Sequence, residues 1–135
     1  MIKKEYLKTF SNNSGITTNK LESLKFPKNL PQDYLEFLII FNGGEGFVGE
    51  NYLVLTKAES LLQLNMDSGI DTFDNQIFLI GGNGASEAIA IDFRNDNPKY
   101  ILLPLIFEYD AILELGATIE DLFAHIFEKG FFKEE

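Results

Sequence analysis

Residues 76–107 read QIFLIGGNGASEAIAIDFRNDNPKYILLPLIF, and this stretch decides the fold. It holds three runs with the composition of β-strands, at Gln76–Ile80, Glu87–Asp92 and Lys99–Phe107. The connections between the runs are rich in glycine, asparagine and aspartate, which favour tight turns. Both are too short for the crossover helix that parallel neighbours need. The stretch therefore predicts three neighbouring strands of an antiparallel meander.

A helix is predicted before the meander. Pro31 occupies its first position, where the missing N–H costs nothing, and Asp33 lies near the positive end of the helix dipole. Apolar residues follow at helical spacing up to Phe41, and the Asn-Gly-Gly sequence at 42–44 is typical of a helix end. We expect this helix to end near residue 42.

A second amphipathic helix is predicted after the meander. Thr118 supplies a capping side chain at its start, and Gly130 supplies its stop. Its apolar residues fall on one face, which must pack on the sheet: Ile119, Leu122, Phe123, Ile126 and Phe127.

Weaker patterns fill the remaining chain. Residues 2–10 have apolar side chains at helical spacing and predict a short first helix, followed by a loop at 11–15. Tyr52–Leu55 has strand composition, and Thr56–Glu59 matches a capping box, which predicts a short helix after that strand. Residues 65–75 are polar and acidic, so we expect a surface loop there.

Together these elements predict an α+β fold, with an antiparallel β-sheet flanked by N-terminal and C-terminal helices. A chain of 135 residues with 45% apolar residues and thirteen phenylalanines can build one hydrophobic core. Because no repeat or linker divides the sequence, we expect residues 1–135 to form a single domain. Residues 16–29 fit either a helix or an extended linker.

The absence of cysteine excludes disulfides, thiolate metal sites and cysteine nucleophiles. The N-terminus is basic but is not followed by the apolar run of a secretory signal. The longest apolar stretch, Tyr100–Phe107, falls short of the about 20 residues needed to cross a bilayer. We therefore expect a soluble, cytoplasmic protein that does not associate with membranes.

The formal net charge of -10 is unevenly distributed. Residues 1–28 carry six lysines against two glutamates, whereas residues 29–128 carry seventeen acids against three cations. Such a field repels the phosphates of nucleic acids and accelerates encounter with a basic protein. It therefore argues against direct nucleic-acid binding and favours a protein partner, although solubility alone also favours an acidic surface.

Acidic side chains in the predicted loops are the candidates for contact with such a partner, since loops expose their side chains. Seven residues meet this description: Glu45, Glu50, Asp67, Asp71, Asp74, Glu108 and Asp110. The sequence leaves the identity of the partner and the oligomeric state open.

No pattern points to catalysis. The segment Gly82–Glu87 begins like a dinucleotide-binding fingerprint, but Glu87 occupies the third glycine position and a strand follows, which indicates a hairpin turn. His125 is the only histidine and has no motif partner for zinc or for a catalytic triad. The acids of Asp67–Asp74 lack the spacing of a calcium-binding loop. We therefore predict no cofactor, no metal and no enzymatic activity.

The order of these elements resembles that of one family, the SUKH superfamily of Smi/Knr-type proteins. The resemblance covers about residues 21–127 and rests on the order and spacing of several short motifs. These are Leu30-Pro31 with Tyr34, Phe37 and Leu38; Asn42-Gly43-Gly44; the strand Ile77–Ile80 leading into Gly81-Gly82-Asn83-Gly84; the strand ending in Ile91-Asp92; and the helix opening Thr118-Ile119-Glu120-Asp121-Leu122-Phe123.

The resemblance implies an α+β fold without shared catalytic residues. For bacterial members it implies an immunity protein that neutralises a toxin domain, often a nuclease. For fungal members it implies a scaffold or regulator of cell-wall glucan synthesis. We expect the first role here and keep the second as the alternative. The matching residues look structural, and none is implied to contact a partner.

Overall fold

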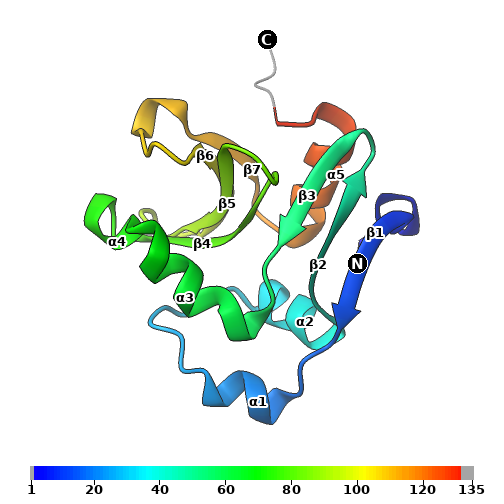
Figure 1. The fold of residues 1–135 in the computed structure, drawn as a ribbon, viewed down its shortest axis with the longest axis horizontal. Coiled ribbons are helices and arrows are strands. Elements are labelled where there is room, and N and C mark those ends of the chain that lie inside the picture. The colour runs from blue at the N-terminus through cyan, green and yellow to red at the C-terminus, as the bar shows by residue number, and fades with distance from the viewer. Residues whose placement is uncertain (1, 132–135) are drawn as a thin grey trace.

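Within residues 2–131, which the computed structural model describes, seven strands pair in chain order to form one antiparallel sheet (Figure 1). The N-terminal elements are the 3-10 helix η1 (Lys4–Leu7), β1 (Thr9–Ser14), α1 (Thr18–Ser23), α2 (Gln32–Ile40), β2 (Phe41–Val48) and β3 (Asn51–Leu55). They are followed by α3 (Ala58–Ser68), α4 (Ile70–Phe73), β4 (Ile77–Gly82), β5 (Glu87–Asp92), β6 (Lys99–Pro104), the 3-10 helix η2 (Tyr109–Ala111), β7 (Leu113–Gly116) and α5 (Ile119–Lys129). The α+β class and the antiparallel meander are confirmed.

Strands β4, β5 and β6 arise from the three runs that the sequence predicts. The third run is shorter than expected, because β6 ends at Pro104, a residue without the N–H that a ladder needs. The Leu105 N–H still donates to the Ser86 carbonyl (2.9 Å), and Ile106 and Phe107 then begin the connection to β7.

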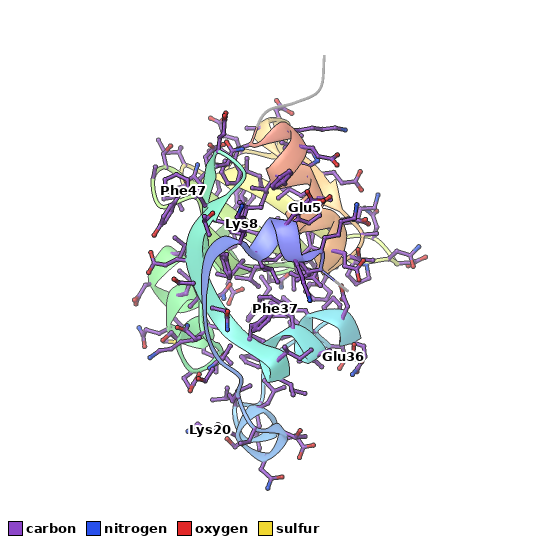
Figure 2. The ribbon with its side chains drawn as sticks, turned by 90° about the vertical axis from the view of Figure 1, so that its right-hand side faces the viewer. Glu5, Lys8, Lys20, Glu36, Phe37 and Phe47 are labelled. Atoms are coloured by element: carbon purple, nitrogen blue, oxygen red, sulfur yellow. The ribbon has the colours of Figure 1, made fainter. Side chains whose placement is uncertain are left out.

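Helices cover both faces of the sheet, and α3 contributes to both cores, with Ala58 and Leu61 in the larger one and Leu64 beside the smaller one. The larger core lies between the sheet and α2 and α5, and it contains Tyr34, Leu38 and Phe123. A smaller core lies on the opposite face of β4–β6 under α3 and α4, and it contains Ile70 and Leu79. Figure 2 shows α3 on one side of the sheet and α2 and α5 on the other. Because β4–β6 are buried on both faces, their sequences are continuously apolar.

The β1–β3 half of the sheet is covered on one face only. Along β2 the exposed Glu45 and Phe47 alternate with buried Gly46 and Val48, which is the pattern of a strand with one solvated face. Within the described residues no helix covers the outer face of this half, and Figure 2 shows Phe47 on this outer side.

The two halves of the sheet join at a close backbone contact. Strand β3 pairs with β4 at Val54↔Gly82 and Leu55↔Gly81. A Cβ atom on Gly81 would lie 2.0 Å from the Val54 carbonyl oxygen, so only glycine allows this approach. The N–H of Thr56 extends the junction by donating to the Ile80 carbonyl (2.9 Å).

The N-terminal prediction was wrong in its detail. Of the helix predicted at residues 2–10, only the 3-10 helix η1 is present. The segment 11–15 was predicted as a loop, but it contributes most of the edge strand β1. The alternating exposure of Thr9 and Ser11 around buried Phe10 is a strand pattern that the helical spacing of the flanking residues concealed. Residues 16–29, which were open between helix and linker, contain the short helix α1, capped by the Thr17 hydroxyl.

The end of α2 also differs from the prediction. The helix stops at Ile40 and passes directly into β2 at Phe41, so the Asn-Gly-Gly sequence lies inside a strand. Gly43 does have a positive φ of 76°, but its added Cβ would lie 2.4 Å from the Leu55 carbonyl oxygen. Gly43 is therefore required by the close approach of β3 and not by a helix end.

Helix α3 begins as predicted, but its cap comes from elsewhere in the chain. Neither Thr56 nor the N-cap residue Lys57 caps the helix with its side chain. The buried Asn42 of β2 accepts from the Ala58 N–H through Oδ1 (2.7 Å) and donates through Nδ2 to Glu59 Oε1 (2.7 Å). This bond lowers the pKa of the Glu59 carboxyl.

The predicted surface loop at 65–75 is instead the end of α3 followed by α4, so Asp67 and Asp71 lie on helices. The fully buried Ile70 holds α4 against the smaller core. Buried Asn65 accepts from the Leu79 N–H (2.7 Å) and donates to the Leu79 carbonyl (2.9 Å), which ties α3 to β4.

The C-terminal helix α5 agrees with the prediction. The Thr118 hydroxyl accepts from the Asp121 N–H (3.0 Å), and Gly130 ends the helix with a positive φ of 68°. Strand β7, which comes before it, was not predicted, because its four residues Leu-Glu-Leu-Gly are too few to give a period.

Substitution of two glycines separates backbone strain from crowding. Gly43 and Gly69 have similar φ values of 76° and 71°, but nothing lies within 4 Å of a Cβ added at Gly69. We expect Gly69→Ala to cost about 1 kcal/mol from the left-handed conformation. Gly43→Ala should cost a further 1–3 kcal/mol or so from overpacking against β3. Urea denaturation of both variants measures the difference, and equal losses would contradict the close approach of β3 to Gly43.

Candidate protein-binding surface

The seven acidic candidates fall into two separate groups. Glu45 lies on β2, and Glu50 lies in the turn between β2 and β3. The other five belong to α3, α4, η2 and the segments beside them, on the β4–β7 half: Asp67, Asp71, Asp74, Glu108 and Asp110. Glu108 and Asp110 were expected to lie after the last strand, because Lys99–Phe107 was the last strand predicted. This expectation is wrong, since both residues precede β7. The structure therefore does not bring all seven together.

Glu45 lies among aromatic side chains on the uncovered face of β1–β3. The Tyr52 hydroxyl donates to Glu45 Oε2 (2.5 Å), and this bond raises the pKa of the tyrosine. The Tyr52 ring packs edge-on against the ring of Phe47, with centroids 5.2 Å apart. Phe47 is 51% exposed, so this face presents an apolar surface beside a carboxylate.

Asp74 has a structural contact that the sequence did not indicate. Its carboxylate accepts from the Tyr109 hydroxyl (2.8 Å), which raises the pKa of that tyrosine. The Tyr109 ring lies 4.5 Å from the ring of Phe73, and the Arg94 guanidinium lies 5.2 Å from the Tyr109 ring centroid. Asp74 therefore helps to hold η2 against α4, whereas Asp71, Glu108 and Asp110 are exposed.

An ion pair between a buried carboxylate and a partly exposed guanidinium lies next to this contact. Asp92 at the end of β5 is 6% exposed and accepts from Arg94 Nε (3.0 Å), Arg94 Nη2 (2.8 Å) and the Arg94 N–H (2.9 Å). Burial raises the pKa of Asp92, but the hydrogen bonds from Arg94 outweigh it and hold the pKa below its usual value. The pair fixes the turn between β5 and β6.

An apolar groove of about 420 Å³ lies between η1, α2 and the start of α5. Its apolar lining comes from all three elements and from the chain beside them: Ile2, Leu7, Phe37, Ile40, Phe41 and Ile119. Four charged residues also line it: Lys4, Asp33, Glu36 and Glu120. In Figure 2 Phe37 lies in this region and Glu36 lies farther out on α2. The sequence could not indicate the groove, because it forms only where segments distant in the chain meet.

Asp33 connects this groove to the C-terminal helix. Its carboxylate accepts from the Ile119 N–H (2.6 Å) and from the Tyr100 hydroxyl (3.1 Å). Asp33 thus caps the N-terminus of α5 from a distant helix and satisfies one of its unpaired N–H groups. The sequence assigned Asp33 to the dipole of its own helix and missed this second role.

The structure also describes the motifs considered for catalysis. The turn 82–87 joins β4 and β5 as a hairpin, and Asn83 Oδ1 accepts from the N–H groups of Ala85 (3.1 Å) and Glu87 (3.2 Å). These amides are therefore occupied and do not form a phosphate cradle. His125 lies half-buried on α5. Residues 2–131 contain no group of three or more acidic or histidine side chains placed to hold a metal ion.

The fold and this surface define a class: a small α+β domain with an acidic exterior, one uncovered sheet face and an apolar groove lined by carboxylates. The model of the SMI1 / KNR4 family (SUKH-1) matches residues 17–125, most of the chain, and the protein belongs to this family. Proteins of the SUKH family typically interact with other proteins. Among curated proteins, none gives a significant match. In the part of the chain that the structure describes, no helix is long and apolar enough to span a membrane.

The Asp92–Arg94 pair makes the stability of the protein depend on pH. Because the folded-state pKa of Asp92 is lowered, its contribution is present above the unfolded pKa and is lost as pH falls below the usual value of 3.8. We expect Asp92→Asn to reduce the free energy of unfolding by about 1.5–3 kcal/mol at neutral pH. The variant should also lose less stability than the wild type on acidification. Asp96→Asn, an exposed position in the same turn, is the control.

Urea melts of the three proteins between about pH 7 and pH 3 provide the measurement. An Asp92→Asn variant whose stability falls as steeply with acid as that of the wild type would contradict the assignment.

Proposed function

We propose that this protein is an immunity protein, a non-catalytic domain that acts in the cytoplasm by binding a basic, nuclease-type toxin domain and blocking it. Membership of the SUKH-1 family supports a protein-binding role. The observation that carries the choice of partner is the charge distribution: residues 29–128 hold seventeen acids against three cations.

The ion pairs of the structure strengthen this charge argument. Two of the three cations in that segment are already engaged, Arg94 with Asp92 and Lys99 with Glu114, each at 2.8 Å. They therefore neutralise acids within the domain and add no positive surface for an anionic ligand. The remaining acidic surface repels nucleic acid, and it attracts the cations with which a nuclease domain grips phosphates.

Apolar contact must accompany this attraction, because exposed charges alone contribute little affinity. The domain offers two such surfaces: the uncovered face around Phe47 and the groove beside Phe37. Glu45 accompanies the first, and three carboxylates accompany the second. Both combine an apolar centre with negative charge, as a binding site for a basic protein requires.

Association kinetics test the proposal. The partner to be tested is a toxin domain found by searching the genes that neighbour the gene for this protein, purified in an inactive form. We expect the association rate to fall steeply between low and physiological salt, because the Debye length shrinks to about 8 Å. Co-expression should also protect cells from the active toxin domain. A neighbouring toxin that neither binds nor is neutralised would contradict the proposal and favour the role in cell-wall regulation.

Neutralised variants test the contribution of the acidic candidates. Asp74 is left intact because it supports Tyr109. Combined amide substitutions at the other six should slow association by roughly tenfold without unfolding the protein: Glu45, Glu50, Asp67, Asp71, Glu108 and Asp110. The pairs Glu45→Gln with Glu50→Gln and Glu108→Gln with Asp110→Asn change the charge equally on the two halves of the sheet. Stopped-flow traces of the pairs show which half faces the partner, and an unchanged rate in the combined variant would remove these residues from the binding surface.

A further inference from the structure

The groove between η1, α2 and α5 has a rigid floor. Phe37 at its base is 4% exposed, and its ring lies 6.0 Å from the rings of both Phe41 and Phe123. Phe37 therefore belongs to the main core and cannot move aside to fill the groove. The shape of this surface is set before any ligand binds, which lowers the entropic cost of binding.

Ile40 forms an exposed apolar edge of this groove. It is 56% exposed, although it lies in the last turn of α2. The helix passes into β2 at the next residue, and the Ile16 N–H donates to the Leu38 carbonyl (3.0 Å), so the turn is held in place. Ile40 cannot rotate into the core without disrupting this join. Ile40 therefore stays exposed and extends the apolar lining of the groove into one contiguous surface.

The charges at the groove have one predominant sign. Among residues 2–131, three carboxylates, Asp33, Glu36 and Glu120, line it against one ammonium group, that of Lys4. Asp33 is held by hydrogen bonds from the Ile119 N–H and the Tyr100 hydroxyl, so it is already oriented. A ligand that fits this groove carries an apolar group for the floor and positive charge beside it.

We infer that this groove receives a basic amphipathic segment of the partner protein, with one apolar side chain against Phe37 and Ile40 and flanking lysine or arginine residues against the carboxylates. The inference rests on the proposed function and gives the toxin domain one defined point of attachment. Helix-in-groove recognition of this kind uses an apolar face for affinity and charged neighbours for orientation.

Peptide binding tests the groove by itself. The probe is a synthetic amphipathic helix of leucine and lysine, about four turns long, and its leucine and glutamate counterpart is the charge control. Chemical shifts of the isotope-labelled protein should change around Phe37, Ile40 and Phe41 with the lysine peptide only. Equal effects of both peptides would overturn the charge argument, and shifts centred on another surface would overturn the site.

A matched pair of variants makes the site specific. Ile40→Lys and Ile106→Lys introduce the same charge at exposed isoleucines, and Ile106 is 82% exposed and does not line the groove. We expect Ile40→Lys to weaken the lysine peptide by at least about tenfold, and Ile106→Lys to weaken it by less than about threefold. Thermal melts check that both variants fold. Ile40→Ala is the substitute if Ile40→Lys does not fold, and it should weaken binding in the same direction.

The same variants, tested against the toxin domain, separate the two hypotheses. If the toxin domain binds and Ile40→Lys weakens it more than Ile106→Lys does, the groove is its docking site. Toxin binding that is indifferent to Ile40→Lys overturns the groove and leaves the immunity function standing. A groove that binds the lysine peptide while the toxin domain does not bind at all contradicts the immunity function, and the segment then belongs to another basic protein.

Discussion

The architecture depends on one backbone contact, the approach of β3 to β4 at Gly81, where any Cβ would meet the Val54 carbonyl oxygen at 2.0 Å. This contact continues the hydrogen-bonded ladder from a half-covered group of strands into a group that is buried on both faces. It allows α2, α5 and the start of α3 to pack on one face while α4 and the rest of α3 pack on the other. The groove and the uncovered face of β1–β3 both follow from this division.

Polar side chains that reach across the chain hold the helices in this arrangement. Asn42 caps α3, Asp33 caps α5, and Asn65 pairs with both backbone groups of Leu79. Each supplies a hydrogen bond to a buried or terminal backbone group that would otherwise cost about 1–3 kcal/mol if left unpaired. In each case the side chain and the backbone group it bonds lie at least 14 residues apart in the sequence. These hydrogen bonds therefore form only once the tertiary structure is in place.

The sequence predicted those elements whose signals are local. The three strands of the meander and the helix after Thr118 are marked by the spacing of their own apolar residues and by the turn residues beside them. They appear in the structure nearly as expected. The helix end at 42–44 was misread because an Asn-Gly-Gly sequence serves equally a helix end and a strand that another strand approaches closely. Among the site residues, Glu45 and Asp74 were chosen by charge, but their tyrosine partners lie 7 and 35 residues away and could not be inferred. The groove has no local signal at all, since η1, α2 and α5 meet only after folding.

Each strand pairs with the next strand in the sequence, and this order affects how the protein folds during its synthesis. A sheet that grows in chain order closes short loops from β4 onward, and short closures cost little entropy and favour rapid folding. Two pairings are exceptions, because α1 and α2 separate β1 from β2, and α3 and α4 separate β3 from β4. The β2–β3 hairpin and the strands from β4 to β7 can therefore each begin to pair as the chain leaves the ribosome, and β1 joins the sheet as an outer strand. A protein with this order of assembly becomes available for binding soon after its synthesis.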